Sequence, residues 1–237
     1  MHAAVVTVGD ELLSGETINT NAAWLGRQLT ERGVSVERTT VVPDRVADVA
    51  CVVNEYHAEY DAVLVTGGLG PTHDDVTMEG VAAAFGRDLE ASDAVRERLT
   101  EEGGYAREDL VEGTTHVPAG ARPLHNEEGV APGCVIGSVY VLPGVPEEMK
   151  AMFEAVAAEF EVDGGGPHVL TVETPEPESA LIGRLRELRE RFDVTVGSYP
   201  GETVRIRIRG SDEERVENAA GWLRERVELV EDGDESG

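Results

Sequence analysis

Residues 62–77 read AVLVTGGLGPTHDDVT, and this stretch decides the fold. Ala62–Thr66 lack charge and predict a strand buried on both faces, as the strands of parallel sheets are. The three glycines that follow predict a turn. The run from about Val76 to Phe85 then predicts a helix that ends at Gly86. Strand, glycine-rich loop and helix in this order are typical of an α/β fold.

The same alternation of strands and helices extends over about the first 160 residues. Asp44 is expected to cap one helix, and Pro146 to open another. The buried face of the Pro146 helix is expected to comprise Met149, Met152, Phe153, Val156 and Phe160. Further strands are expected at 4–8, 34–42 and 139–142, and a further helix near 21–32. We therefore expect a doubly wound, mostly parallel sheet with helices on both faces.

Gly164-Gly165-Gly166-Pro167 predicts a linker between two domains. After it, the patterns predict a strand at 168–174, a helix at 178–191, two further strands, and a last helix capped by Ser211 or Asp212. This order, βαββα, predicts a small α+β domain. The expected domains are 1–163 and 167–230, followed by a frayed acidic tail at 231–237.

The composition is strongly acidic. The 237 residues carry 20 Lys+Arg against 47 Asp+Glu, a net charge of −27, and Lys150 is the only lysine. Concentrated salt shortens the Debye length to about 3 Å at 1 M, which screens such self-repulsion. We therefore favour a halophilic protein over an acidic protein of an ordinary cytoplasm.

Several classes of protein are disfavoured by the same sequence. No apolar run approaches the about 18 residues of a membrane span, and no basic segment precedes the first strand, so we expect a cytoplasmic protein without membrane contact. The two cysteines, Cys51 and Cys134, cannot form a disulfide framework, and both are expected to face inward as inert apolar residues.

A nucleic-acid partner is also not expected, because a surface this acidic repels phosphates. The exception to this acidity is a group of arginines in the second domain. Neither a Gly-x-x-Gly loop nor stacking aromatic residues accompany them, so ion pairing with glutamates such as Glu187 and Glu190 is favoured. These arginines are Arg184, Arg186, Arg189, Arg191, Arg205, Arg207 and Arg209.

The candidate site lies in the loops after the strands, because ligands of doubly wound sheets bind at the carboxyl ends of strands. Gly67, Gly68 and Gly70 could expose backbone amides to a phosphate, or serve a tight turn alone. Asp74 and Asp75 on the same loop could cap the following helix or bind a divalent cation.

Asp10 and Glu11 follow the first strand and are expected near Asp74 and Asp75. Four carboxylates beside a phosphate site would repel a polyphosphate, and a bridging cation would resolve that conflict and activate water. His73 could serve as a ligand or base, although a lone loop histidine is more commonly solvated. Of Asn19, Thr20 and Asn21, one is expected to cap the helix, and another amide to bind a purine or pterin edge.

Taken together, these motifs resemble the CinA family. The motifs are Gly9–Gly15 (including Ser14), Asn19–Asn21, Gly67–Thr77, Asn126–Gly133 and Leu142–Met149. The resemblance implies a molybdopterin-binding fold in which the Gly67–Thr77 loop binds the phosphate of a pterin or nucleotide. It also implies that Asp75 corresponds to the acidic residue that these proteins use near the phosphate. Residues 168–227 resemble the KH-like segment of that family. The chain ends at Gly237, so the deamidase activity of longer members with a C-terminal amidohydrolase domain is not expected.

The leading hypothesis is a divalent-metal-dependent nucleotide pyrophosphatase that acts on ADP-ribose or FAD. Asp10, Glu11, Asp74 and Asp75 would hold Co²⁺, Mg²⁺ or Mn²⁺ or activate water. The ligand would bind at Gly67, Gly68, Gly70, Thr72, Thr77, Ser14, Asn19 and Asn21. The glycines and the two threonines would hold its phosphate, and the two asparagines would contact its base. The alternatives are a pterin-binding or adenylyl-transfer protein of molybdenum-cofactor synthesis, with molybdopterin as ligand, and a non-catalytic binding module. The resemblance also implies a homo-oligomer.

Overall fold

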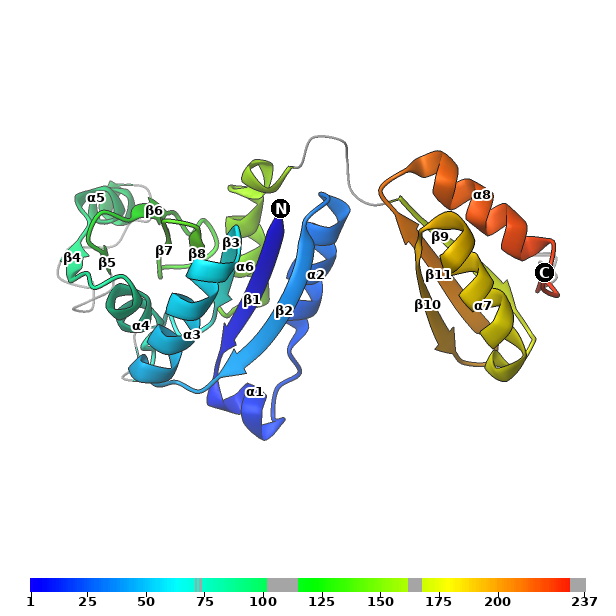
Figure 1. Cartoon of the computed structure of the whole chain (residues 1–237). Coiled ribbons are helices and arrows are strands. Elements are labelled where there is room, and N and C mark those ends of the chain that lie inside the picture. Colours follow the sequence, from blue (N-terminus) through cyan, green and yellow to red (C-terminus); the bar gives the residue numbers. More distant parts are fainter. Residues whose placement is uncertain (71, 73, 102–114, 162–167, 231–237) are drawn as a thin grey trace, which may run out of the picture. The chain divides into compact units, whose positions relative to one another are not determined.

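The computed structural model describes all residues except 71, 73, 102–114, 162–167 and 231–237. The chain divides into two compact units, Met1–Gly165 and Gly166–Gly237 (Figure 1). The expected linker at 164–167, the expected tail at 231–237 and His73 lie outside the described residues. Within the described part, no helix is both long enough and apolar enough to cross a membrane.

The first unit is built on a six-stranded mixed sheet. Its strand order is β2-β1-β3-β8-β7-β6. The pairs β1/β2, β1/β3 and β3/β8 are parallel, whereas β7/β8 and β6/β7 are antiparallel. The strands are β1 (His2–Val8), β2 (Ser35–Val42), β3 (Ala62–Thr66), β6 (Arg122–Leu124), β7 (Gly133–Ile136) and β8 (Val139–Leu142). The expected mostly parallel sheet is confirmed.

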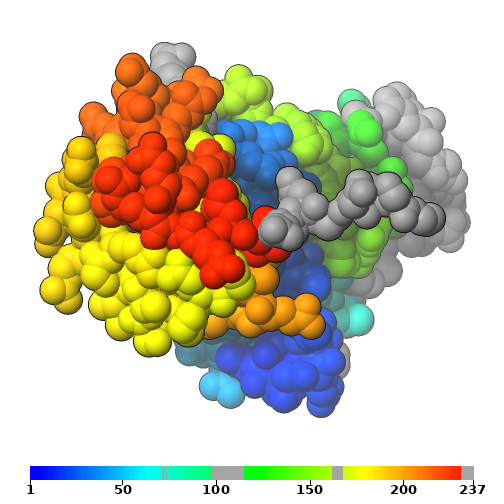
Figure 2. Space-filling view, turned by 90° about the vertical axis from the view of Figure 1, so that its right-hand side faces the viewer, coloured from blue at the N-terminus to red at the C-terminus, as the bar shows by residue number. Residues whose placement is uncertain are grey.

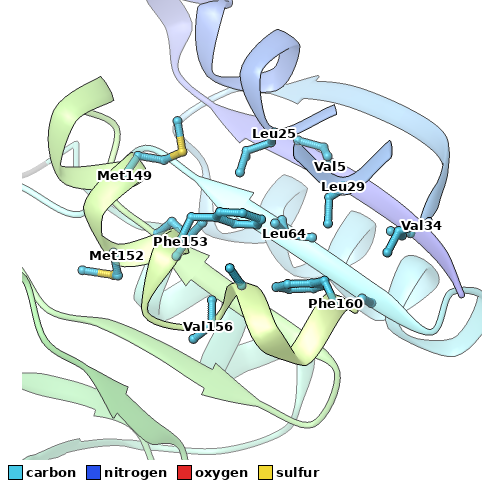
Figure 3. Packing of buried hydrophobic residues seen from close by; sticks show 14 of the residues in the cluster. Val5, Leu25, Leu29, Val34, Leu64, Met149, Met152, Phe153, Val156 and Phe160 are labelled. Carbon is cyan, nitrogen blue, oxygen red and sulfur yellow. The ribbon is translucent and has the colours of Figure 1, made fainter. Parts of the chain in front are cut away.

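Helices cover both faces of this sheet. On one face, α2 (Thr20–Glu31), α6 (Pro146–Glu154) and the 3₁₀ helix η2 (Ala157–Phe160) pack over Val5 and Leu64 (Figure 3). On the other, α3 (Val46–Glu59) and α4 (Thr77–Ala84) pack over Val6 and Val65. Successive strand residues thus face different cores, which explains why the central strands are continuously apolar.

The expected helix from Pro146 to Phe160 is two elements. α6 ends at Glu154, and Phe160 belongs to η2. Burial of the apolar face is nevertheless confirmed, since Met149, Met152 and Phe153 on α6 have at most 1% of their surface exposed. The apolar face continues across the break, since Val156 and Phe160 also have at most 1% of their surface exposed.

Two local predictions are wrong. Cys51 is exposed, because α3 buries Val49, Val53 and Tyr56 on one side and Cys51 falls on another. Asp44 does not cap α3, whose N-cap is Arg45 without a side-chain bond. Cys134 is buried as expected, and burial raises the pKa of its thiol to about 12, so the thiol is unreactive at neutral pH.

Short elements escaped the sequence analysis. The segment Gly9–Gly15 was expected as a loop but contains the five-residue helix α1 (Asp10–Ser14), which ends at Gly15 with φ +79°. A two-stranded sheet of β4 (Leu89–Ala91) and β5 (His116–Pro118) accompanies α5 (Asp93–Glu101). Strands of three residues are too short to show a period of two.

The second unit has the expected element order and is a small α+β domain. β9 (His168–Thr174), α7 (Glu178–Phe192), β10 (Thr195–Pro200), β11 (Val204–Gly210) and α8 (Glu213–Arg224) follow one another. The antiparallel sheet has the order β10-β11-β9. Asp212 is the N-cap of α8, with its Oδ1 accepting from the Arg215 amide at 2.7 Å. Leu181, Leu185 and Leu188 of α7 are buried against the sheet, as predicted.

An ion pair joins the start of α7 to the segment that follows α8. The Arg184 guanidinium donates to Glu176 Oε1 at 3.0 Å and to Oε2 at 2.5 Å. The Glu228 amide donates to Glu176 Oε1 at 2.8 Å, and the Arg226 carbonyl also accepts from Arg184. Pairing of these arginines with glutamates was expected from the sequence, and for Arg184 the glutamate is Glu176.

Glu176→Gln is expected to lower the thermal midpoint of the second unit at neutral pH. The bond from Arg184, and then that from the Glu228 amide, lower the pKa of Glu176 from its ordinary 4.5 to about 2. A carboxyl with a depressed pKa stabilises the fold fully above pH 4.5, and this stabilisation is lost as the pH falls toward 2. Thermal unfolding followed by circular dichroism between these pH values should show a shallower decline in the variant. Glu187→Gln on the exposed face of α7 is the control, and equal pH profiles for Glu176→Gln and wild type would contradict the expectation.

Candidate functional site

A pocket of about 260 Å³ lies at the carboxyl ends of β1 and β3 in the first unit. This is the edge of the sheet at which the sequence analysis placed the site. The lining is contributed by Thr7, Val8, Gly9, Glu11, Leu12, Thr17, Ile18, Asn19, Thr20, Asn21, Asp44, Thr66, Gly67, Gly68, Asp74, Asp75, Gly144 and Pro146.

A wider hollow of about 740 Å³ belongs to the second unit. It is a shallow surface between the end of α7 and α8, and the ion pair of Arg215 with Asp193 at 3.3 Å lies in its wall. None of the residues expected to bind a ligand lines it. The enclosed pocket of the first unit is therefore the candidate site.

Asn19 closes one side of the pocket. Its Oδ1 accepts from the Ala22 amide at 3.1 Å, so Asn19 is the N-cap of α2, as one of the three polar residues was expected to be. Its Nδ2 donates to Thr7 Oγ1 at 2.9 Å and ties the helix to the end of β1. The amide of Asn19 is thus committed to the scaffold.

Asn21 lies one residue inside the same helix and binds the loop after β8. Its Nδ2 donates to the Gly144 carbonyl at 2.7 Å, and Thr66 Oγ1 donates to the Pro143 carbonyl at 2.5 Å. Asn21 Oδ1 is a buried acceptor with no hydrogen-bond partner among the described residues. Such an acceptor favours a bound group that donates a hydrogen bond.

The glycine-rich loop turns tightly at Gly67 and Gly68. Both have left-handed φ values, +102° and +62°. A Cβ on Gly67 would overlap the Val8 carbonyl oxygen, and a Cβ on Gly68 would overlap Thr77 Oγ1. Gly70 is not left-handed, but a Cβ there would lie 2.6 Å from Asp75 Oδ2. The tight-turn interpretation is thereby confirmed for Gly67 and Gly68, while their phosphate role stays a prediction.

The two threonines of this loop are committed to it. Thr77 is fully buried, and its hydroxyl donates to the Gly67 carbonyl at 2.8 Å. The Thr72 amide donates to Asp75 Oδ2 at 2.9 Å, and the Thr72 hydroxyl donates to the same oxygen. Asp75 therefore shapes the loop and does not cap α4, whose N-cap is Val76. Neither Thr72 nor Thr77 lines the pocket.

Four carboxylates line the pocket, but they are not the four that the sequence indicated. Glu11, Asp74 and Asp75 are among them, and Asp44 takes the place of Asp10. Asp44 Oδ2 accepts from the Asp10 amide at 2.8 Å, so Asp10 contributes its backbone to the site. Within the described residues, none of the lining side chains is Lys, Arg or His.

The structure thus brings together part of the predicted set. Glu11, Asn19, Asn21, Gly67, Gly68, Asp74 and Asp75 line the pocket, whereas Asp10, Ser14, Gly70, Thr72 and Thr77 do not. Ser14 is exposed, and its hydroxyl donates to the Glu11 carbonyl at 3.2 Å. Sequence reasoning missed Thr7, Thr66 and Asp44 as lining residues. A threonine near the end of two otherwise aliphatic strands was the available signal, because Thr7 and Thr66 are paired in register.

Two helix N-termini oppose this negative charge. Thr20 and Asn21 begin α2, and Pro146 begins α6, and all three residues line the pocket. The N-terminus of a helix carries about half a positive charge. The pocket can therefore hold an anion at these N-termini and a cation at its carboxylates.

A divalent cation fits the donor set, with one restriction. Carboxylate oxygens are the ligands that hard cations prefer. Within the described ranges, however, no three side chains of His, Cys, Asp or Glu are grouped as ligands of one metal ion. A cation here would therefore need ligands from a bound substrate and from water, as Mg²⁺ commonly does.

Comparison with known proteins gives consistent results for both units. Residues 4–161 match the family described as "Probable molybdopterin binding domain", and residues 167–231 match "FAD synthase, middle domain". A protein of Archaeoglobus fulgidus is 39% identical over 227 residues, which is 95% of this chain and 97% of the relative. A CinA-like protein of Frankia casuarinae is 43% identical over 167 residues, 65% of this chain and 39% of the relative. The crystal structure of CinA from Thermoplasma acidophilum has 38% identity and a TM-score of 0.63, covering 67% of this chain and 97% of that one.

Proposed function

This chain belongs to the molybdopterin-binding-domain family and, within it, to the CinA-like proteins, and on that premise we propose that it hydrolyses the pyrophosphate of a nucleotide such as ADP-ribose or FAD with the help of a divalent cation. Water would be added across a P–O–P linkage, and two phosphate monoesters would leave.

The observation that carries the proposal is the charge of the pocket. Glu11, Asp44, Asp74 and Asp75 face it, and no basic side chain among the described lining residues balances them. An enzyme that bound a pyrophosphate with protein cations would place arginine or lysine here. A carboxylate-lined pocket instead favours substrate that arrives with its own divalent cation.

Glu11 and Asp74 or Asp75 would hold the cation, and the chemistry that it would supply is neutralisation of phosphate charge and a more electrophilic phosphorus. The residues of the chain would do the rest. The N-termini of α2 and α6 would bind phosphate oxygens, and a pocket carboxylate would accept the proton of the attacking water. Asn21 Oδ1 would accept from a hydroxyl or amino group of the substrate, since it has no partner of its own among the described residues.

Purified protein should release AMP from ADP-ribose or FAD only when Co²⁺, Mg²⁺ or Mn²⁺ is added. ATP serves as a comparison nucleotide, and the reactions are run at high and at low KCl because the fold carries a net charge of −27. Glu11→Gln should lower the rate at least about 100-fold, as the loss of a group that stabilises charge in a transition state commonly does. Chromatographic measurement of AMP checks both expectations.

Two matched variants control this experiment. Glu16→Gln removes an exposed carboxylate in the same segment that does not line the pocket, and should leave the rate unchanged. Asp75→Asn should also lower the rate, but it disturbs the bond to Thr72, so its folding must be compared with that of Asp88→Asn. Metal-independent turnover, or full activity of Glu11→Gln, would refute the proposal.

A pterin-binding role without hydrolysis is the second candidate. It is favoured by Asn21 Oδ1, a buried acceptor without a partner in the described part of the chain, because the edge of a pterin presents several N–H donors. Titration of the protein with a reduced pterin, followed by fluorescence, distinguishes the two. Tight binding with no release of AMP from any nucleotide would favour this candidate.

A further inference from the structure

Within the second unit, one face of the sheet is not covered by the described helices, and we call it the open face. α7 and α8 cover the other face, where Val172, Val196, Ile206 and Ile208 are buried. Figure 2 shows the outer surface of these helices, with α7 in yellow and α8 in orange to red. Because side chains alternate along a strand, the residues between these buried positions point to the open face. On β11 they are Arg205, Arg207 and Arg209.

Among the residues that the structure describes, these three arginines have no ion partners. Arg205 and Arg207 are exposed and Arg209 is half-buried, and none forms an ion pair or side-chain hydrogen bond with a described residue. Some other arginines of the unit are engaged. Arg184 binds Glu176, Arg189 binds the Val196 carbonyl at 3.1 Å, and Arg226 binds the Trp222 carbonyl at 3.0 Å. The open face is thus a cationic stripe in a protein of charge −27.

An aromatic ring lies beside the stripe. Tyr199 is directly opposite Arg205, and Gly197 is opposite Arg207. A Cβ on Gly197 would lie 2.9 Å from Tyr199 Cε2 and 3.0 Å from its hydroxyl oxygen, so the ring extends over the glycine on the open face. Almost half of the Tyr199 surface remains exposed. Nucleic acid was not expected from the sequence because the surface is acidic and because neither a Gly-x-x-Gly loop nor stacking aromatics accompany the arginines. The strand pairing removes the last of these grounds, since it brings Tyr199 beside Arg205.

We propose that the open face formed by Arg205, Arg207, Arg209 and Tyr199 binds a short stretch of single-stranded nucleic acid. Alternate residues of a strand are about 6.6–6.8 Å apart, so the guanidinium groups form a row that can contact successive phosphates of an extended strand. The exposed Tyr199 ring offers a stacking surface for a base, and such surfaces are tolerant of sequence.

An acidic polypeptide would satisfy the arginines but would make no use of the ring. Stacking requires a planar π system, which carboxylate side chains lack and every nucleobase has. Glu173, which lies opposite Arg205 on β9, also places one negative charge at the end of the stripe. That arrangement limits the binding site to a few phosphates and suits a single strand better than a duplex, whose charge is denser.

The test measures binding of fluorescein-labelled oligo(dT) and oligo(rU) to the full chain by anisotropy over a series of KCl concentrations. Three phosphate contacts should give a slope of about −2 for the logarithm of the binding constant against the logarithm of the salt concentration, since each contact contributes about −0.7. Tyr199→Leu should weaken binding by between about 5-fold and 100-fold, which is the range for loss of one stacked base. Tyr199→Phe should restore it.

Arg207→Gln should weaken binding and reduce the slope, whereas the matched control Arg186→Gln, on α7 and away from the open face, should do neither. The triple replacement of Arg205, Arg207 and Arg209 by glutamine should abolish binding, with circular dichroism as the check on folding. A labelled poly-glutamate peptide is the competing probe. Peptide binding as tight as that of the oligonucleotides and unaffected by Tyr199→Leu would overturn the proposal in favour of a protein partner. Absence of oligonucleotide binding at low salt would also overturn it.

Discussion

Gly67→Ala should abolish the proposed hydrolysis while leaving the second unit folded. The residue has φ +102°, and an added Cβ would overlap the Val8 carbonyl oxygen. Backbone on the opposite side is close as well, since a Cβ on Gly144 would lie 3.2 Å from Gly67 Cα. The loop must therefore move away from β1, and a displacement of about 1 Å in a catalytic site can cost about 100-fold in rate. Release of AMP and thermal unfolding should be measured on the same preparation.

The control for Gly67→Ala is Gly120→Ala. Gly120 also has a left-handed φ, +80°, but a Cβ there meets no atom within 4 Å. Gly120→Ala therefore measures only the conformational strain of an alanine with a left-handed backbone, about 1–2 kcal/mol. Any additional loss in Gly67→Ala is then due to the collision with Val8. Equal loss of stability in the two variants, with activity retained in Gly67→Ala, would show that the collision with Val8 has no consequence for the site.

Phe153→Ala should lower the free energy of unfolding of the first unit by about 3–5 kcal/mol, the usual cost of emptying an aromatic core position. Phe153 is fully buried on α6 and lies at the centre of the cluster in Figure 3. Its ring is 5.4 Å from that of Trp24 and 5.5 Å from that of Phe160, measured between centroids. Denaturant unfolding followed by tryptophan fluorescence measures the loss, because Trp24 reports on this cluster.

Phe85→Ala provides the comparison for Phe153→Ala. Phe85 is only half-buried and contacts His57 at a centroid distance of 4.5 Å, so its removal leaves a space that water can enter. The expected cost is smaller for this reason. A loss for Phe153→Ala no greater than that for Phe85→Ala would mean that the cluster between α2, α6 and the sheet is not the principal core of the unit.

The central elements of the fold were predictable because their signals are local. Ala62–Thr66 and Val139–Leu142 coincide with β3 and β8, and the apolar spacing of α2 and α6 identified their buried faces. The antiparallel strands β6 and β7 were not predicted as a pair, since their partners are set by the completed sheet. The prediction that Cys51 faces inward is wrong. Its sequence neighbours Ala50 and Val52 are apolar, but the residues of α3 that are buried in the core are Val49 and Val53.

The candidate site was predicted in place but not in detail. Strand ends located it, and the caps and turns of Asn19, Gly67 and Gly68 follow from local rules. Whether Asp10 or Glu11 faces the pocket depends on the orientation of helix α1. A helix of five residues is too short for its hydrophobic pattern to reveal that orientation. Asp44 enters because β2 is paired with β1, so that its end lies beside Gly9, whose amide donates to the Val42 carbonyl at 3.1 Å.

The arginines illustrate the same limit. In the sequence, the arginines of α7 and β11 form one basic group. In the structure, α7 packs against one face of the second unit's sheet, and the arginine side chains of β11 lie on the other face. Tyr199 lies opposite Arg205 because of the way β10 pairs with β11. The residue spacing within either strand alone does not reveal which residues will be opposite each other.

The parallel pairing of β3 with β8 has a kinetic consequence. It joins residues such as Val63 and Val139, so the long intervening chain must lose entropy before the contact contributes any stability. The β10–β11 hairpin joins Pro200 to Val204 and closes a loop of a few residues. Folding rates fall as contacting residues become more distant in the sequence. The C-terminal unit should therefore acquire its sheet early during refolding, and the pocket, built where β1 and β3 end, should be completed late.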